Sequence, residues 1–412
     1  MQFQTISDLT PRIRQGVVEI PVCTLRGGTS TGVILETAHL PKEQSLREEI
    51  LREIMGSPSL PMMGTLSPET LKKNTQTTGL GRGSPTSNKC FLVQKSQRSD
   101  CQLESTLAQL SPQTAAIDWR ANCGNFSSAL PLFALERGWV APRVGQNTLG
   151  VWNHNTGLRL ELTLMLDIQG RYTLAEIDGV LGQGPTVLAT LFDPVGVETG
   201  MLLPTGSPMD RIGGIPCSLI DSGIPMVIIN VQDLGLTLDT VLEAFKQDSK
   251  QFERFKQLWQ KAALKLGLKD AHGNLLTETE IAKTETMPKV CLIGPATDSR
   301  AHLRVQYFTP QHSHASLAVS GGTCIATGAM IPGSLVHQAL PSIPEAIGNT
   351  RKIVLQHPAG IMNFYLNWNS PDHTTDPEKL YSVSYERSAQ LFGYSHFPLY
   401  QASNQVFKFY SS

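Results

Sequence analysis

The sequence predicts an α+β protein made of two related halves, in each of which several strands curl around one central buried helix. The chain has 412 residues, which is long for a single core, so two domains are expected. Its hydrophobic share of 40%, against 17% charged residues, is enough for two cores. In addition, four features of the first half return in the second half in the same order.

The first of these features is a hairpin pattern, in which a proline and a nearby cysteine precede a polar glycine turn and a β-branched run. An apolar strand that opens near a lysine follows, and two strands about a tight turn close each half. The matched segments are 21–35 with 216–230, 87–100 with 287–300, and 151–165 with 352–368. The separations Cys23 to Cys217, Lys89 to Lys289 and Cys123 to Ser320 are 194, 200 and 197 residues. Such near-constant offsets indicate a duplicated unit.

The remaining feature is a strand followed by a small polar turn and an apolar run that is expected to form the buried helix. The runs 126–135 and 315–330 have no polar face, and a helix that is apolar on all sides is buried. The first run follows the letters RANCGN at 120–125, and the second contains LAVSGG at 317–322. Each half is therefore predicted to place small residues at the start of its central helix.

The division between the halves is expected in the segment 204–215, which is dense in glycine, proline and serine. The segment 242–286 is amphipathic, highly charged and rich in helix formers, which predicts a helical insertion. The predicted domains are 15–207, completed by 380–412, and 208–379 with the insertion at about 238–285.

Composition excludes several classes of function. A net charge of −1 gives no reason to expect nucleic acid or a membrane surface as partner. No run reaches the roughly 18 apolar residues of a membrane span, and the first twenty residues lack a signal-peptide core. The seven cysteines have no regular spacing and form neither CxxC nor a metal-binding pattern with histidine. These features predict a cytoplasmic protein without a metal site.

The start of each central helix is the candidate site. Helix N-termini present unpaired N–H groups and partial positive charge, and a glycine there lets a carboxylate approach the backbone. The same field stabilises a thiolate, so Cys123 is a candidate reactive group. Most free cysteines are small core residues, and Cys324, one turn into the second apolar run, is expected to be one of them.

Seven motifs occur in a fixed order along the chain. They are RGGTSTG (26–32), TTGLGRGSPTSNK (77–89), ANCGN (121–125), LFDPVGVETGMLLPTG (191–206), SLIDSGIPMV (218–227), AVSGG (318–322) and HPAG (357–360). Together they resemble the PrpF family, which includes methylaconitate isomerases and 4-oxalomesaconate tautomerases and is related in fold to diaminopimelate epimerase. The resemblance extends over roughly residues 17–395.

The resemblance implies a diaminopimelate epimerase-like fold with two pseudo-symmetric domains, each a β-barrel-like sheet wrapped around a central buried helix. It also implies an isomerase that uses no cofactor and moves a carbon–carbon double bond in a small unsaturated polycarboxylic acid. The family's lysine after the TS motif maps onto Lys89, and the cysteine of its CGN motif maps onto Cys123, 34 residues further along. A homodimer is an open alternative to a monomer.

An allylic proton shift needs a base and an acid, together with fixed donors that stabilise an enolate-like intermediate. Lys89 is expected to take or return the proton, and Cys123 to act as a second acid or base or as a substrate contact. The expected substrate-binding residues are Arg26, Ser30, Thr31, Ser87, Gly124, Asn125, His314, Ser320, Gly321, Gly322 and His357. Of these, Gly124, Asn125, Gly321 and Gly322 are expected to act through their backbone N–H groups.

Three other functions are weighed against this one. A cofactor-free epimerase of the same fold needs two acid/base groups, and the counterpart of Cys123 is Ser320, whose hydroxyl is a poor acid. A non-catalytic carboxylate-binding accessory protein remains an alternative. A nucleotide-binding enzyme is disfavoured because GLGRGS at 79–84 precedes a strand rather than a helix.

Two positions depart from the family pattern. Thr31 stands where many members have lysine, and Ile224 stands where the family tends to have asparagine. The first change removes a cation and the second a polar group. Both suggest a substrate that is less charged than a tricarboxylate, or differently shaped.

Overall fold

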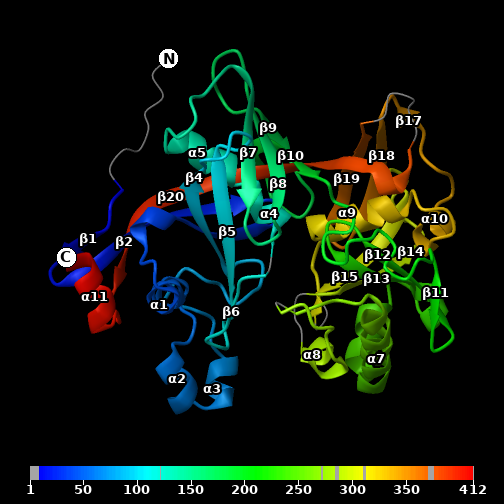
Figure 1. Cartoon of the computed structure of the whole chain (residues 1–412), viewed down its shortest axis with the longest axis horizontal. Helices are drawn as coiled ribbons and strands as arrows, with labels where there is room; N and C mark the ends of the chain where they lie inside the picture. Colours follow the sequence, from blue (N-terminus) through cyan, green and yellow to red (C-terminus); the bar gives the residue numbers. More distant parts are fainter. Residues whose placement is uncertain are drawn as a thin grey trace. The chain divides into compact units, whose positions relative to one another are not determined.

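A computed structural model describes residues 9–120, 122–270, 272–283, 287–309, 312–369 and 375–411. It is a mixed α/β protein whose strands pair into a large sheet (Figure 1). Its contacts divide the chain into two compact units, of which the first is Met1–Ala189 with Arg387–Ser412 and the second is Thr190–Glu386. The sequence expectation put these boundaries at 207/208 and 379/380.

The strands that lie in the first unit, or begin there, are β1 (Arg12–Arg14), β2 (Val17–Gly27), β3 (Ser30–Glu36), β4 (Lys89–Lys95), β5 (Leu103–Leu110), β6 (Ile117–Asp118), β7 (Gly145–Asn153), β8 (Leu158–Leu166), β9 (Leu174–Glu176) and β10 (Gln183–Phe192). Its helices are η1 (Thr37–His39), α1 (Gln44–Met55), α2 (Leu60–Thr65), α3 (Pro68–Lys72), α4 (Gly124–Ser127), α5 (Leu130–Glu136) and α11 (Asn404–Ser411).

Strand pairing in the first unit alternates between antiparallel and parallel. β2–β3, β4–β5 and β7–β8 are antiparallel, whereas β3–β4 and β5–β7 are parallel. A parallel pair needs a crossover connection, and helices usually provide it. η1 and α1 to α3 lie in the β3–β4 connection, and α4 and α5 lie in the β5–β7 connection. The topology therefore places α4 against the sheet.

The second unit contains the strands β11 (Asp210–Ile212), β12 (Ile215–Asp221), β13 (Pro225–Asn230), β14 (Lys289–Gly294), β15 (Leu303–Thr309), β16 (His312–Ser313), β17 (Ala346–Ile347), β18 (Thr350–His357) and β19 (Gly360–Trp368), and β20 (Leu380–Leu399) begins there. Its helices are η2 (Val231–Leu234), α6 (Val241–Gln247), α7 (Ser249–Lys265), α8 (Glu278–Lys283), α9 (Val319–Gly328), α10 (Leu335–Ala339) and η3 (Pro377–Lys379).

The order of pairings in the second unit repeats that of the first. β12–β13, β14–β15 and β18–β19 are antiparallel, and β13–β14 and β15–β18 are parallel. Helices α6 to α8 occupy the β13–β14 connection, the place that α1 to α3 hold in the first unit. The sequence singled out only the second of these connections as a helical insertion. α9 follows β15 as α4 follows β5.

The two faces of the first sheet bury different parts of β4. Cys90 and Leu92 pack in a cluster with residues of α1 such as Ile50. Side chains alternate along a strand, so Lys89 and Phe91 lie on the opposite face. There the ring of Phe91 stacks on Phe126 of α4, with centroids 5.2 Å apart. Lys89 is therefore on the face of the sheet that α4 covers.

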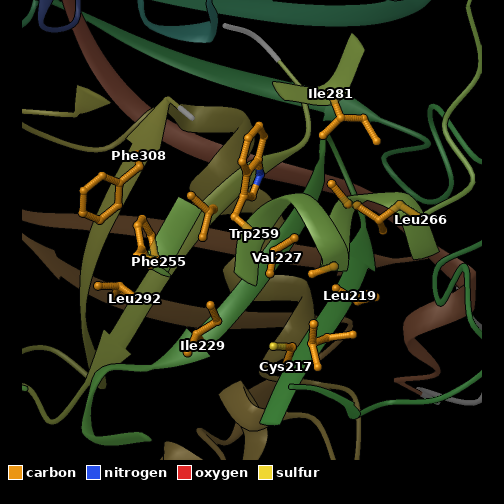
Figure 2. Packing of buried hydrophobic residues seen from close by; sticks show 14 of the residues in the cluster. Cys217, Leu219, Val227, Ile229, Phe255, Trp259, Leu266, Ile281, Leu292 and Phe308 are labelled. Carbon is orange, nitrogen blue, oxygen red and sulfur yellow. The ribbon is translucent and has the colours of Figure 1, made fainter. Parts of the chain in front are cut away.

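The second unit buries the apolar stripe of α7 against its strands. Phe255, Trp259, Ala262 and Ala263 recur every three to four residues and are all buried. Figure 2 shows Phe255 and Trp259 among side chains of the strands such as Val227. The indole N–H of Trp259 donates to the carbonyl of Pro288 at 3.1 Å, so its polar atom is satisfied in the core.

The central helices are shorter than the apolar runs predicted. The run 126–135 is buried, but α4 ends at Ser127 and α5 begins at Leu130. Pro131 has no N–H to donate to the carbonyl of Ser127, and the Ser128 hydroxyl donates to Asn125 O at 2.6 Å. α9 begins at Val319, so the residues from 315 to 318 precede the helix. Among the described helices, none is both long enough and apolar enough to cross a membrane.

Candidate active site

The turn between β2 and β3 lies against the start of α4. A Cβ atom at Gly27 would be 2.7 Å from the carbonyl oxygens of both Asn125 and Phe126, so only glycine allows this approach. Gly28 has φ +53°, a conformation that favours glycine, and its N–H donates to Ser388 O at 2.9 Å. The two glycines of the RGGTS motif thus bring Ser30 next to the helix start.

Cys123 is the N-cap residue of α4. Its Sγ accepts a hydrogen bond from the N–H of Phe126 at 3.4 Å and is 3.6 Å from the hydroxyl oxygen of Ser30. Asn122 holds the preceding backbone, because its Oδ1 accepts from the N–H of Cys123 at 2.7 Å and from Nδ2 of Asn153 at 2.9 Å. The thiol therefore has a fixed position at the predicted helix start. The N–H of Gly124, in the first turn of α4, has no acceptor within the helix.

Cys123 is also the only partly exposed cysteine among the seven, all of which lie in the described residues. Burial raises the pKa of the Cys217 thiol to about 12 and raises those of Cys23, Cys90, Cys291 and Cys324 as well. A buried, protonated thiol is unreactive. Cys324 lies within α9 and is fully buried, in agreement with the packing role predicted for it.

Alkylation of the native protein is therefore expected to modify Cys123 first. With a small excess of iodoacetamide at neutral pH, mass spectrometry of tryptic peptides should find the label on Cys123, while the six buried cysteines react only in denaturant. Labelling of a buried cysteine at a comparable rate would contradict the exposure described here.

Lys89 begins β4 and is 8% exposed. Its Nζ donates to Oε1 of Gln109, the residue directly opposite on β5. Among the described residues no carboxylate forms an ion pair with it. Lys89 therefore presents a buried amine beside a neutral amide, on the sheet face that α4 covers. The backbone of Lys89 also meets Gly32, because a Cβ there would overlap the Lys89 carbonyl and the Phe126 ring.

Arg26 has a bracing role that the sequence did not predict. Its Nη1 donates to Gly28 O at 2.9 Å and to the carbonyl and hydroxyl oxygens of Ser388, both at 3.1 Å. The side chain is buried, and burial lowers the pKa of the guanidinium. These bonds tie the β2–β3 turn to β20, whereas the sequence prediction was a contact with substrate.

Thr31 and Ser87 lie on the two segments that lead to Lys89. The N–H of Thr31 donates to Thr86 O at 2.9 Å, which joins β3 to the loop before β4. Both the N–H and the hydroxyl of Ser87 donate to Ser84 O, at 2.9 and 3.0 Å. The buried Ser87 hydroxyl thus closes a turn. The side chain of Thr31, near the start of β3, is half-buried.

In the second unit, packing explains the glycine pair at the start of α9. A Cβ at Gly321 would overlap the ring of Tyr307, and one at Gly322 would overlap the ring of Phe364. The N–H of Gly322 donates to Ala318 O at 2.9 Å, so it is used inside the helix. This corrects the prediction that the Gly322 N–H binds a carboxylate. Gly321 belongs to the first turn, whose N–H groups have no acceptor within the helix.

Ser320 does not hold the cap position that Cys123 holds. The N-cap of α9 is Ala318, and Ser320 is the second residue of the helix. The sequence offset pairs Ser320 with Cys123, but the helix of the second unit begins earlier relative to its SGG letters than α4 does relative to CGN. Ser320 is half-buried, and its carbonyl lies near Gly223 of the β12–β13 turn.

The two histidines that were predicted to bind substrate, His314 and His357, also lie in the second unit. Nδ1 of His314 accepts from the N–H of Ser316 at 3.0 Å, and Nδ1 of His357 accepts from the N–H of Ala359 at 3.2 Å. In a neutral ring this places the proton on Nε2. His357 is buried at the end of β18, and His314 is half-buried after β16.

One group of predicted site residues lies in the first unit: Arg26, Ser30, Thr31, Ser87, Lys89, Cys123, Gly124 and Asn125. The other group lies in the second unit: His314, Ser320, Gly321, Gly322 and His357.

Asp221 is a buried acid that sequence reasoning passed over. Its Oδ2 accepts from the N–H of Glu198 at 2.9 Å and from the N–H and hydroxyl of Thr199 at 2.7 and 2.9 Å. Burial raises the pKa of this carboxyl, and the hydrogen bonds oppose that shift. Asp221 therefore anchors the VETG segment beside the β12–β13 turn. An acidic residue at the end of a buried strand was the signal available in the sequence.

Two other features of the described residues are separate from these groups. A cavity of about 380 Å³ in the second unit is lined by apolar residues that include Phe245, Phe255 and Leu258, and by charged residues that include Asp233, Arg254 and Lys261. None of the predicted site residues lines it. Within the described part of the chain, no three His, Cys, Asp or Glu side chains are grouped so that they could hold a metal ion.

Comparison with known proteins gives the family. A model of the PrpF protein family matches residues 17–390. The 4-oxalomesaconate tautomerase of Pseudomonas putida is 30% identical over 348 residues, which cover 84% of this chain and 88% of that protein.

Two crystal structures show likeness of fold. Methylitaconate-delta-isomerase superposes with a TM-score of 0.72 at 24% identity, covering 94% of this chain and 97% of that one. A hydroxyproline epimerase from Agrobacterium vitis superposes with a TM-score of 0.50 at 10% identity, covering 94% and 93%. The fold is thus similar both to an isomerase and to an epimerase. The family match extends over most of the chain and confirms the resemblance drawn from the seven motifs: the chain belongs to the PrpF family and is an isomerase of that family.

Proposed function

We propose that this chain catalyses a 1,3-allylic proton shift, without a cofactor, in an unsaturated di- or tricarboxylic acid such as oxalomesaconate or methylaconitate. The observation that carries the proposal is that one unit holds both a buried amine and a partly exposed thiol. Lys89 lies on the sheet face that α4 covers, and Cys123 caps that helix. The name of the 30% identical tautomerase supports the same class of substrate.

In the proposed reaction one side chain removes a proton from the carbon next to the double bond. The electron pair spreads over the allyl system and an adjacent carboxylate or carbonyl, and a proton is then delivered to the far carbon. Lys89 takes or returns the proton, and Cys123 is the second acid/base or a substrate contact. Both side chains can exchange protons, which is what this step requires.

The developing negative charge needs donors that are fixed before the reaction. In the first unit we propose the N–H groups of Gly124 and Asn125, with the hydroxyls of Ser30 and Thr31. The Ser87 hydroxyl donates to Ser84 O, so we propose that Ser87 supports the site by holding the loop before Lys89. In the second unit we propose hydrogen-bond donors to a substrate carboxylate at four residues, His314, Ser320, Gly321 and His357. Arg26 acts on the site by bracing the β2–β3 turn, because its Nη1 is bonded to Gly28 and Ser388.

We also propose that the chain forms two epimerase-like domains, 15–207 with 380–412 and 208–379, each with a barrel-like sheet around its central helix. The repeated order of strand pairings supports this proposal. We further propose the cytoplasm as the compartment, since all seven cysteines are free thiols, which suits a reducing environment.

The test is to incubate the protein in D2O with a panel of unsaturated di- and tricarboxylic acids and to follow each by NMR. For the true substrate the alkene signals are expected to move to the neighbouring carbon pair, with deuterium entering at the carbon that receives the new proton. Thr31 stands where many family members have a lysine, so this chain has one cation fewer at that position. Dicarboxylates therefore belong in the panel beside oxalomesaconate and methylaconitate. Deuterium exchange or alkene movement in none of the acids would contradict the proposed substrate class.

A further inference from the structure

Gln109 is held on one side by three backbone carbonyls. Its Nε2 donates to Asn88 O at 3.0 Å, to Pro85 O at 3.2 Å and to Leu110 O at 3.4 Å. These acceptors fix the orientation of the amide, because a flipped group would place its oxygen against carbonyl oxygens. The amide oxygen therefore faces Lys89, whose Nζ donates to it.

The strand register places Gln109 between a cation and an anion. Lys89 is opposite Gln109 on the β4–β5 pair, and Gln109 is opposite Asp118 on the β5–β6 pair. Residues directly opposite one another point to the same face of a sheet. Asp118 is thus one strand beyond Gln109, and its Oδ1 accepts from the N–H of Arg120 at 2.8 Å.

The other elements around Lys89 bring one further ionisable group. β3 contributes Ser30 and Gly32, and the loop 84–88 contains no charged residue. α4 contributes Cys123 as its cap, while Gly124–Ser127 are uncharged. The partner in contact with the buried amine is therefore a neutral amide. A carboxylate in that place would favour the ammonium form strongly, since opposite charges stabilise each other most when water is excluded.

We propose that Gln109 is a positioning residue for Lys89: it fixes the direction of the amine and leaves it without a counter-charge, so that Lys89 can exchange a proton with substrate. This inference rests on the proposed function of Lys89. The role assigned to Gln109 requires that its side chain is neutral and that the three backbone carbonyls hold its amide in place. Gln109 acts through Lys89 and does not itself transfer a proton.

The decisive variant is Gln109→Glu, with Gln146→Glu as its matched control. Gln146 is exposed on β7, so it undergoes the same change of charge away from the site. In Gln109→Glu the limb of the kcat–pH profile that reports Lys89 is expected to move to higher pH by about 1–3 units, because the carboxylate holds the ammonium form. The direction is the same whether Lys89 acts as acid or as base. Gln146→Glu should leave the profile unchanged.

A second variant covers the risk that a carboxylate among three carbonyls weakens the fold. Gln109→Met keeps the length of the side chain but removes the acceptor. It is expected to lower kcat by about 10- to 100-fold, with little change in KM, because the amine loses its fixed direction. Circular dichroism checks that both variants are folded. A wild-type profile in Gln109→Glu together with a wild-type kcat in Gln109→Met overturns the proposal.

A measurement that needs no substrate separates this inference from the proposed function. Acetic anhydride labels free amines, so labelling of Lys89 across a pH series, read by mass spectrometry, reports its protonation directly. The labelling midpoint is expected to rise in Gln109→Glu and to stay in place in Gln146→Glu. An unchanged midpoint overturns the inference alone. A raised midpoint in a protein whose isomerase activity does not depend on Lys89 overturns the role of Lys89, and the positioning role of Gln109 with it.

Discussion

Replacing Lys89 with methionine is expected to lower kcat for isomerisation by about 10²- to 10⁴-fold, the range typical of a lost acid/base group. Methionine keeps the length and the apolar stem, so the packing of β4 between its neighbours should remain. The amine alone is removed, and Gln109 keeps its three backbone acceptors. The measurement is the rate of alkene migration at saturating substrate, combined with a thermal melt to verify the fold.

The matched control is Lys95→Met. Lys95 ends the same strand that Lys89 begins, but it is exposed. Lys95→Met removes the same charge as Lys89→Met, and it should retain the wild-type kcat. If Lys89→Met keeps more than a tenth of the wild-type rate, Lys89 is not the group that moves the proton.

Replacing Gly27 with alanine is expected to lower the free energy of unfolding by about 1–3 kcal/mol, as overpacking of a tight contact does. The new Cβ would sit 2.7 Å from Asn125 O and Phe126 O and 2.9 Å from Phe126 Cα. All three atoms are backbone, so no side-chain rotation relieves the overlap. α4 must move, and Cys123 moves with it. A urea titration measures the loss of stability, and kcat should fall in the same variant.

Gly64→Ala is the control for this substitution. Gly64 lies in α2, and a Cβ there meets nothing within 4 Å. Alanine favours a helix over glycine by up to about 1 kcal/mol, so this variant should be as stable as the wild type or slightly more stable. Equal stability of Gly27→Ala and Gly64→Ala would contradict the close contact between the β2–β3 turn and α4.

The sequence was sufficient for the features that depend on local pattern. The near-constant offsets led to a duplicated unit, and the structure has the same order of strand pairings in both units. The CGN letters located the start of a helix, and Cys123 is its cap. The motif order gave the family, which the match over residues 17–390 confirms.

The features that sequence reasoning missed depend on partners far along the chain. Arg26 braces a turn through Ser388, which is 362 residues away, so no local pattern connects the two. Gln109 is defined by its register opposite Lys89, and register is a property of the folded sheet. The use of the Gly322 N–H inside α9 follows from where that helix begins, and helix boundaries are poorly specified by composition.

We propose that Lys89 and Cys123 move a proton within an unsaturated acid. The most direct test is the position of deuterium in the product of a reaction run in D2O, compared between the wild type and Lys89→Met. In the wild type one deuterium is expected at the carbon that gains the proton, and in Lys89→Met that incorporation is expected to be lost. Equal incorporation in both proteins, or deuterium at a saturated stereocentre whose alkene has not moved, would contradict it.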